Sequence, residues 1–486
     1  MRSSPGLTVT LAAFRRPLPA VLALAAAGLA LYAYRDLSPR PFAADDYQWL
    51  LNVRGLSFGD LLARAFDAGS QTHFYRPLVW LLIWAQVQVF GLDPAPFHAV
   101  SLGLHLLNAL LAGLLAWRLA GARSAFCIAL AFVALHPAPF EAVVWVSAQS
   151  ELLAAALLLC ALHLWLPWAR GAERVAPGEI FSTLLRALLA SLFLGLALLA
   201  KESAAIGLGL LLLLGSPAPA GRPAALRYAP FGLPAGVTAA YLALQAGILA
   251  RNEIVRGSGY GVGPQLILNP LRALGLVAAP LPGTQYGDAP WLPWAGAALA
   301  ALVALDVSLQ LFRGGSGAGT YLRLGLAVLL TLAPTAPFTS PPDSRYVYLT
   351  VVAVAALLAY RAATLGYWPG ARRSRLPAAL IAGCVGVLLA WWCAGELAAR
   401  EARFAAASGP GGSLWRVTSA ECAAAHPSRV IVVEPPLAPP HAEAIVRLSC
   451  GAEVRPVVVG RDGVEDARRP GALVIAFPGG SAQVER

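Results

Sequence analysis

Charged side chains are scarce in this sequence. They make up 13% of its 486 residues, against roughly one quarter in soluble domains. Hydrophobic residues make up 58%. An ordinary soluble fold is excluded, because it could not bury so many helices that are apolar on every side.

Cofactor and metal motifs are also missing. There is no HExxH, no Walker loop, no GxGxxG between a strand and a helix, and no Ser-His-Asp pattern. The six cysteines form no CxxC pair and no metal-ligand spacing. We therefore expect no ATP, no nicotinamide, no resident cofactor and no divalent metal.

The cysteines fall into two groups. Four lie in apolar runs, where small core residues are expected; they are Cys127, Cys160, Cys384 and Cys393. Cys422 and Cys450 lie in a polar C-terminal tail. These two would form a disulfide if the tail lies outside the cytoplasm.

Long apolar runs recur instead, each suited to a hydrocarbon core of about 30 Å. They predict an all-α polytopic membrane protein with about eleven spans, the first of them uncleaved. The spans lie near 17–34, 98–117, 124–137, 150–168, 181–200, 203–216, 230–250, 292–312, 321–337, 346–363 and 376–394. Two shorter stretches, 77–91 and 265–281, predict either a span or an interfacial helix.

Arginine placement selects one topology. The net charge of +11 lies mainly in short loops between apolar runs, which indicates the positive-inside bias of a membrane protein and argues against a nucleic-acid partner. With 77–91 on the outer face, nearly all of these arginines face inward. This arrangement predicts an inner N-terminus, outer loops at 35–97 and 251–291, and an outer C-terminal segment. Scarce lysine and abundant Ala, Gly, Pro and Arg indicate a GC-rich bacterial genome, hence a bacterial cytoplasmic membrane.

The chain divides into a transmembrane domain, 1–394, and a small extracytoplasmic module, 395–486. A charged helical stretch, 396–404, precedes Gly/Pro-rich segments that are typical of linkers. The apolar runs 429–433 and 472–476 predict buried strands of an α/β module.

An acidic pair stands in the first outer loop, about ten residues beyond the first span. Asp45 and Asp46 repel one another, so their placement costs energy unless a cation, a hydrogen-bonding shell or a reaction uses one of them. A carboxylate there can take the proton from an acceptor hydroxyl. A solvated acidic turn is the alternative.

Three basic residues also stand in the predicted outer loops. Arg76 can pair with a phosphate or anchor the chain at the interface. Lys201 and Glu202 interrupt a long apolar hairpin, or form a simple turn. Arg345 departs from the charge bias, which an anionic phosphate would explain.

Further polar residues, His136, Glu141 and Glu151, lie on the same predicted side. Polar groups at this depth serve function or helix packing. His98, His105 and His163 are expected to be packing or interfacial residues. The convergence on one face predicts an outer site that handles an anionic lipid.

These clusters resemble the GT-C superfamily of glycosyltransferases. The resemblance is to transmembrane O-mannosyltransferases with luminal TPR repeats and, more distantly, to protein O-mannosyltransferases and the lipid A aminoarabinose transferase. The stretches that carry it are FAADDY at 42–47, YRPL at 75–78, FHAVSLGLH at 97–105, LHPAPFEAV at 135–143, AQSELL at 148–153, LAKES at 199–203 and RYVYL at 345–349.

The resemblance implies a GT-C fold and an inverting transfer of a sugar, mannose or similar, from a polyprenyl-phosphate donor to a hydroxyl. It implies that Asp45 or Asp46 is the general base and that Arg76, Lys201 and Arg345 hold the donor phosphate. The substrate pocket would include Tyr75, His136, Glu141, Glu151, Glu202 and Tyr346. The α/β tail replaces the TPR repeats, so a protein, lipid or glycan acceptor stays open.

Three other functions remain. A transporter or flippase of lipid-linked sugars would favour charges at mid-membrane depth and two similar halves; here only Asp306 lies deep in a span, and we expect it to be paired locally. An O-antigen-type polymerase or ligase shares the outer-face chemistry. A membrane scaffold is the third alternative.

Overall fold

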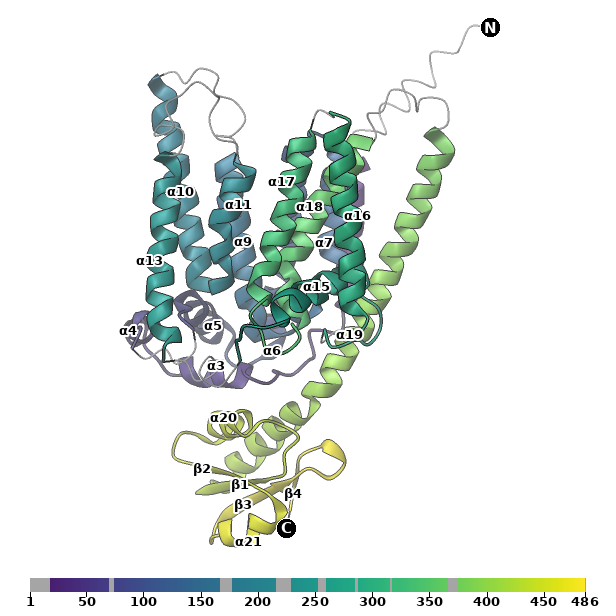
Figure 1. The fold of residues 1–486 in the computed structure, drawn as a ribbon. Coiled ribbons are helices and arrows are strands. Elements are labelled where there is room, and N and C mark those ends of the chain that lie inside the picture. The colour runs from purple at the N-terminus through teal and green to yellow at the C-terminus, as the bar shows by residue number, and fades with distance from the viewer. Residues whose placement is uncertain are drawn as a thin grey trace.

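The computed structural model describes residues 18–69, 74–166, 177–215, 229–251, 259–284, 287–314, 317–365 and 375–485. A helix coincides with each predicted span: α2 (Leu18–Ala33), α6 (Pro94–Ala120), α7 (Arg123–Leu135), α9 (Gln149–Trp165), α10 (Pro177–Ala200), α11 (Ile206–Leu214), α13 (Gly232–Leu249), α16 (Leu292–Phe312), α17 (Ala318–Leu332), α18 (Tyr348–Leu365) and α19 (Arg375–Ala425). They form an upright bundle (Figure 1).

The bundle belongs in a membrane. Within the described residues, six helical segments are long and apolar enough to cross one. Large apolar side chains point outward from three different helices: Leu188 of α10 is 53% exposed, Leu302 of α16 is 64% exposed and Leu388 of α19 is 69% exposed. Such surfaces suit lipid rather than water. The chain is therefore a multi-pass membrane protein.

The two ambiguous stretches form short helices, α5 (Pro77–Phe90) and α15 (Gln265–Ala278), of 14 residues each. At 1.5 Å per residue each is about 21 Å long, less than the hydrocarbon thickness. Both lie at the end of the bundle nearest the C-terminal module, together with α3 (Asp46–Val53) and α4 (Phe58–Phe66), and α15 runs across the bundle (Figure 1). Their length and position favour interfacial helices.

The acidic residue deep in a span is paired as expected. Asp306 of α16 accepts from the Arg361 guanidinium of α18, at 2.6 Å from Nε and 3.0 Å from the terminal nitrogen. The Tyr321 hydroxyl donates to the same carboxylate at 2.9 Å. Local pairing gives this charge a structural role and removes one argument for a transport pathway.

The predicted linker between the two parts is wrong. Helix α19 is continuous over 51 residues, from the last span through Pro410 and the surrounding glycines. A Cβ on Gly412 would lie 2.7 Å from Cβ of Pro41 in the first outer loop, so glycine allows a close approach that any side chain would prevent. Gly412 therefore forms a packing contact with the first loop. The C-terminal module is connected to the last span by the continuous helix α19.

The module contains the predicted strands. They are β1 (Arg429–Val433), β2 (Arg455–Val459), β3 (Ala472–Ala476) and β4 (Gln483–Val484), with α20 (Pro439–Cys450) and α21 (Val464–Ala467) between them. The order is β2-β1-β3-β4; β1 is parallel to β2 and β3, and β4 is antiparallel to β3. The central strand β1 is covered on both faces, which explains its unbroken apolar sequence.

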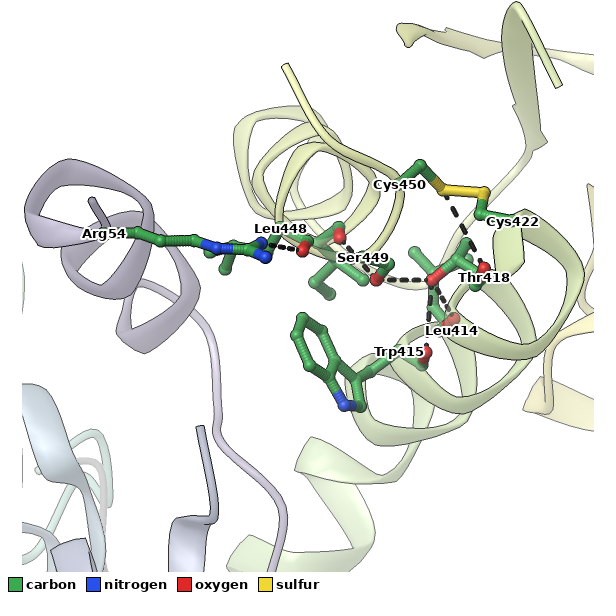
Figure 2. The surroundings of a disulfide bond; sticks show 9 residues. Arg54, Leu414, Trp415, Thr418, Cys422, Leu448, Ser449 and Cys450 are labelled. Atoms are coloured by element: carbon green, nitrogen blue, oxygen red, sulfur yellow. Dashed lines mark hydrogen bonds between the residues drawn. A yellow bond between two sulfur atoms is a disulfide. The ribbon is translucent and has the colours of Figure 1, made fainter. Parts of the chain in front are cut away.

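Helix α20 is attached on two sides (Figure 2). A disulfide joins Cys450 at its end to Cys422 in α19, which confirms the predicted pair. Nearby, the Thr418 hydroxyl of α19 donates to Ser449 Oγ at 2.8 Å. On the other side, Arg54 at the end of α3 donates to the Leu448 carbonyl. These contacts hold α20 between the long helix and the first outer loop.

Candidate functional site

A cavity of about 660 Å³ opens between the outer-loop helices and the start of α20. Five of its lining residues are titratable or charged: Asp45, Arg76, Lys201, Arg345 and His441. The others are aromatic, amide, hydroxyl or small residues: Ala44, Gln48, Trp49, Asn52, Phe74, Trp80, Trp145, Ser147, Ala148, Ser150 and Tyr346. The cavity joins residues that are up to about 400 positions apart in the sequence.

The residue before the acidic pair, Ala44, has a left-handed backbone conformation. Ala44 has φ of 46°, a conformation that costs a non-glycine residue about 1–2 kcal/mol. Asp45 follows it and caps α3. Its side chain lines the cavity, and Oδ1 is buried with no hydrogen-bond partner. Burial raises the pKa of Asp45 above its ordinary value, against the opposing effects of a hydrogen bond with Ser147 and of the Arg345 charge.

Asp46 has different surroundings. It is buried, and Oδ2 accepts from the Ala43 amide at 2.9 Å. Oδ1 accepts from the Ser147 amide at 2.6 Å and the Ser147 hydroxyl at 2.5 Å. Burial and the neighbouring Asp45 charge raise the pKa of Asp46 to about 7. Asp46 thus ties the first outer loop to the 3₁₀ turn η1 (Val146–Ala148).

All three cations in the cavity pair with carboxylates, and two of them pair with a single glutamate each. Arg76 donates to Glu202 by a forked pair of bonds, 2.8 Å from Nε and 2.7 Å from the terminal nitrogen. Lys201 donates to Glu151, and both side chains are 5% exposed. The pairs fix the position of each cation and reduce the cost of burying its charge.

Arg345 is held by charge and by aromatic rings. Its guanidinium lies 2.8 Å from Asp343 and 3.5 Å from Glu141. The guanidinium carbon is 4.6 Å from the ring centre of Trp145 and 4.7 Å from that of Tyr346. Burial raises the pKa of Glu141 to about 7, although the Arg345 charge opposes this. Arg345 is therefore a rigid cation at the cavity surface.

Of the residues expected in a substrate pocket, Tyr346 lines the cavity. The three carboxylates Glu141, Glu151 and Glu202 instead support Arg345, Lys201 and Arg76. None of the three is among the described residues that line the cavity, and their place in a substrate pocket stays a prediction.

Two more expected residues also lie outside the lining. The Tyr75 amide donates to Gln245 at 3.1 Å, and its hydroxyl donates to the Phe66 carbonyl at 3.2 Å. His136 Nε2 hydrogen-bonds the Val277 carbonyl at 3.1 Å. Both side chains are buried and hold neighbouring segments together. Their positions indicate packing roles.

Lining residues that were not predicted include Gln48, Trp49, Asn52 and His441. The first three follow Asp45 at spacings of three, four and seven residues, which is the signature of one helix face. That spacing was visible in the sequence. No local signal identified His441, because only the tertiary fold brings the module to the cavity.

The donor set does not suit a divalent cation. Asp45 is the one carboxylate among the described lining residues, and three cations share the cavity with it. Magnesium and calcium require several oxygen ligands. Nowhere in the described ranges do three His, Cys, Asp or Glu side chains gather in a way that could hold a metal ion.

No protein-family model and no curated protein matches the sequence. Solved structures do match. The oligosaccharyltransferase of Archaeoglobus fulgidus, tethered to an acceptor peptide, is similar at TM-score 0.55 and 13% identity, over 92% of this chain and 64% of that one. The same archaeal enzyme, AglB, with an inhibitory peptide and a dolichol-phosphate, is similar at TM-score 0.53 and 13% identity, over 92% and 65%.

A third match is ArnT from Cupriavidus metallidurans bound to undecaprenyl phosphate, at TM-score 0.49 and 13% identity, over 95% of this chain and 94% of that one. The similarity in fold rests on the two archaeal structures, whose TM-scores are above 0.5. This chain spans about two thirds of the archaeal enzyme's length. Its fold is similar to that of the archaeal oligosaccharyltransferase.

Proposed function

We propose that the protein is an inverting membrane glycosyltransferase, which moves a sugar from a polyprenyl-phosphate donor to a hydroxyl acceptor. The observation that carries this proposal is the charge arrangement of one cavity. The Asp45 carboxylate, whose Oδ1 has no hydrogen-bond partner, shares the cavity with Arg76, Lys201 and Arg345. A base and an anion-binding surface are the two elements that such a transfer requires.

The reaction begins at the acceptor hydroxyl. Asp45 takes its proton, and the hydroxyl oxygen forms a bond to the anomeric carbon of the donor sugar. The bond between that carbon and the phosphate oxygen breaks on the opposite face, so the configuration inverts. The electron pair leaves with the lipid phosphate, and the proton stays on Asp45 until solvent removes it.

The cations stabilise the charge that collects on the departing phosphate. Because Glu202, Glu151, Glu141 and Asp343 hold them in place, the cations need little reorganisation during the reaction. Their neutralising partners also keep the empty site stable. Asp46 supports the reaction by holding the loop that carries Asp45. The archaeal relative bound to a dolichol-phosphate supports a lipid-phosphate donor for this chain.

The reaction would occur on the outer face of a bacterial cytoplasmic membrane, with about eleven spans crossing it. The arginine distribution supports this orientation. The Cys422–Cys450 disulfide supports it independently, because disulfides persist in oxidising compartments. Mannose or a similar hexose is the proposed sugar.

The test is a transfer assay in reconstituted vesicles with radiolabelled polyprenyl-phosphate sugars and hydroxyl acceptors. We expect label to move from the lipid to the acceptor, with inverted anomeric configuration. Movement of intact labelled lipid between leaflets, without release of sugar, would instead establish a transporter. A product of retained configuration would exclude single displacement.

A further inference from the structure

Several residues that line the cavity differ in chemistry from its three cations. Asp45, Gln48, Trp49 and Asn52 form one face of α3 along its first two turns. His441, in the first turn of α20, lines the same cavity, and the Asp45 charge acts on its imidazole. The catalytic carboxylate therefore stands at the edge of a surface made by two helices from different parts of the chain.

This surface is neutral apart from Asp45 and the titratable His441. Gln48 and Asn52 each offer two donors and one acceptor oxygen, and a neutral imidazole offers one of each. Trp49 lies against Trp80, with ring centres 5.8 Å apart and planes at 80°. Amide groups beside indole rings match a saccharide, whose hydroxyls exchange hydrogen bonds and whose C–H faces pack on aromatic rings.

Other acceptors fit this surface less well. An extended peptide binds best along a free strand edge, where backbone groups are available. No residue of β1, β2, β3 or β4 lines the cavity. An anionic headgroup would prefer the cationic half, which the donor phosphate already requires.

Helix α20 also has a defined position. The Arg54 bond to Leu448 ties it to α3, and the Cys422–Cys450 disulfide ties it to α19. Leu50 of α3 and Ile445 of α20 belong to the same buried apolar cluster. The module therefore presents His441 to the cavity as part of a packed interface.

We infer that α3 and α20 form the acceptor subsite, that it binds a neutral saccharide, and that it presents one sugar hydroxyl to Asp45. This inference rests on the proposed glycosyl transfer and adds the acceptor class. It also gives the C-terminal module a role in acceptor recognition. His441 and Asn52 act as specificity-determining residues, since they contact the acceptor while Asp45 performs the proton transfer.

The first test is direct binding, which needs no turnover. An array of neutral oligosaccharides and of Ser/Thr peptides is probed with the full-length protein in detergent. We expect binding to at least one saccharide, lost or weakened about 5- to 10-fold in Asn52→Ala and His441→Ala, as for removal of one hydrogen bond. Arg447→Ala is the matched control, because Arg447 is exposed on α20 and does not line the cavity.

The second test is kinetic. With the bound saccharide as acceptor, both variants should raise the acceptor KM about 5- to 10-fold while the donor KM stays unchanged. Transfer to peptide but to no saccharide overturns the acceptor class and leaves glycosyl transfer intact. Saccharide binding that depends on His441, without any transfer from lipid donors, keeps the subsite and overturns the proposed reaction. Binding unaffected by either variant overturns the subsite itself.

Discussion

The different surroundings of Asp45 and Asp46 predict opposite consequences for the same substitution. Asp45→Asn removes the proton acceptor. Oδ1 has no hydrogen-bond partner to lose, and an amide oxygen can still accept the hydrogen bond from Ser147. We expect turnover to fall by about 10³-fold or more, the upper range for loss of a positioned base, while donor binding and thermal stability stay close to wild type.

Asp46→Asn acts on stability instead. The Asp46 carboxylate accepts three hydrogen bonds, from the Ala43 amide and from the Ser147 amide and hydroxyl. An asparagine turns an NH₂ group toward one of these donors, so a buried amide N–H loses its acceptor. Loss of one charge-assisted bond with an unsatisfied donor costs about 3 kcal/mol. The residual turnover per folded molecule should stay within about tenfold of wild type.

The assay combines initial rates from a radiolabelled polyprenyl-phosphate sugar with thermal unfolding of the same preparations in detergent. Ser147→Ala is a further probe of this loop. It removes the hydroxyl that donates to Asp46 and that also contacts Asp45, so we expect it to lower stability. If Asp46→Asn abolished turnover with unchanged stability while Asp45→Asn turned over normally, the two roles would be reversed. Normal turnover in both variants would refute a carboxylate base in this loop.

Four further outcomes are expected. Arg345→Lys should raise the donor KM about tenfold or more, because lysine cannot make a forked contact with phosphate; an unchanged donor KM would remove Arg345 from the phosphate site. The kcat/KM should fall as pH drops through the pKa of Asp45, since only its charged form accepts a proton; burial raises that pKa above 3.8, so the acid limb of the profile lies above this pH. Reduction, or Cys422→Ser with Cys450→Ser, should destabilise the module by about 3 kcal/mol for a loop of 28 residues, with Cys384→Ser as the control; equal unfolding midpoints would contradict this. Transfer should survive EDTA, because fixed cations replace a metal; loss reversed only by added metal would contradict that mechanism.

Periodicity and composition carried much of the architecture. The apolar runs predicted the helices, because a chain inside a hydrocarbon core must satisfy its own backbone hydrogen bonds, which a helix does. The length of each run matched the thickness of that core. The runs 429–433 and 472–476 predicted strands of the module for a related reason, because a central parallel strand is apolar throughout. The placement of Cys422 and Cys450 in a polar tail made a disulfide between them possible, and the structure contains that bond.

The predicted linker failed for a physical reason. Glycine and proline usually mark flexible connections, yet glycine also permits close packing of a helix against another segment. The sequence cannot distinguish these uses, because the difference lies in whether Pro41 stands beside Gly412. A contact between segments some 370 residues apart has no local signal.

The sequence by itself determined that this is a helical membrane protein with polar clusters in the loops between its apolar runs, because hydropathy and spacing are local properties. It also contained Asp45, Gln48, Trp49 and Asn52 at the spacing of one helix face. Only the tertiary structure decided which of two adjacent carboxylates faces the cavity, which carboxylates stand behind the cations, and that His441 reaches the same cavity. Those outcomes depend on burial and on partners brought together from distant segments, and a linear pattern records neither.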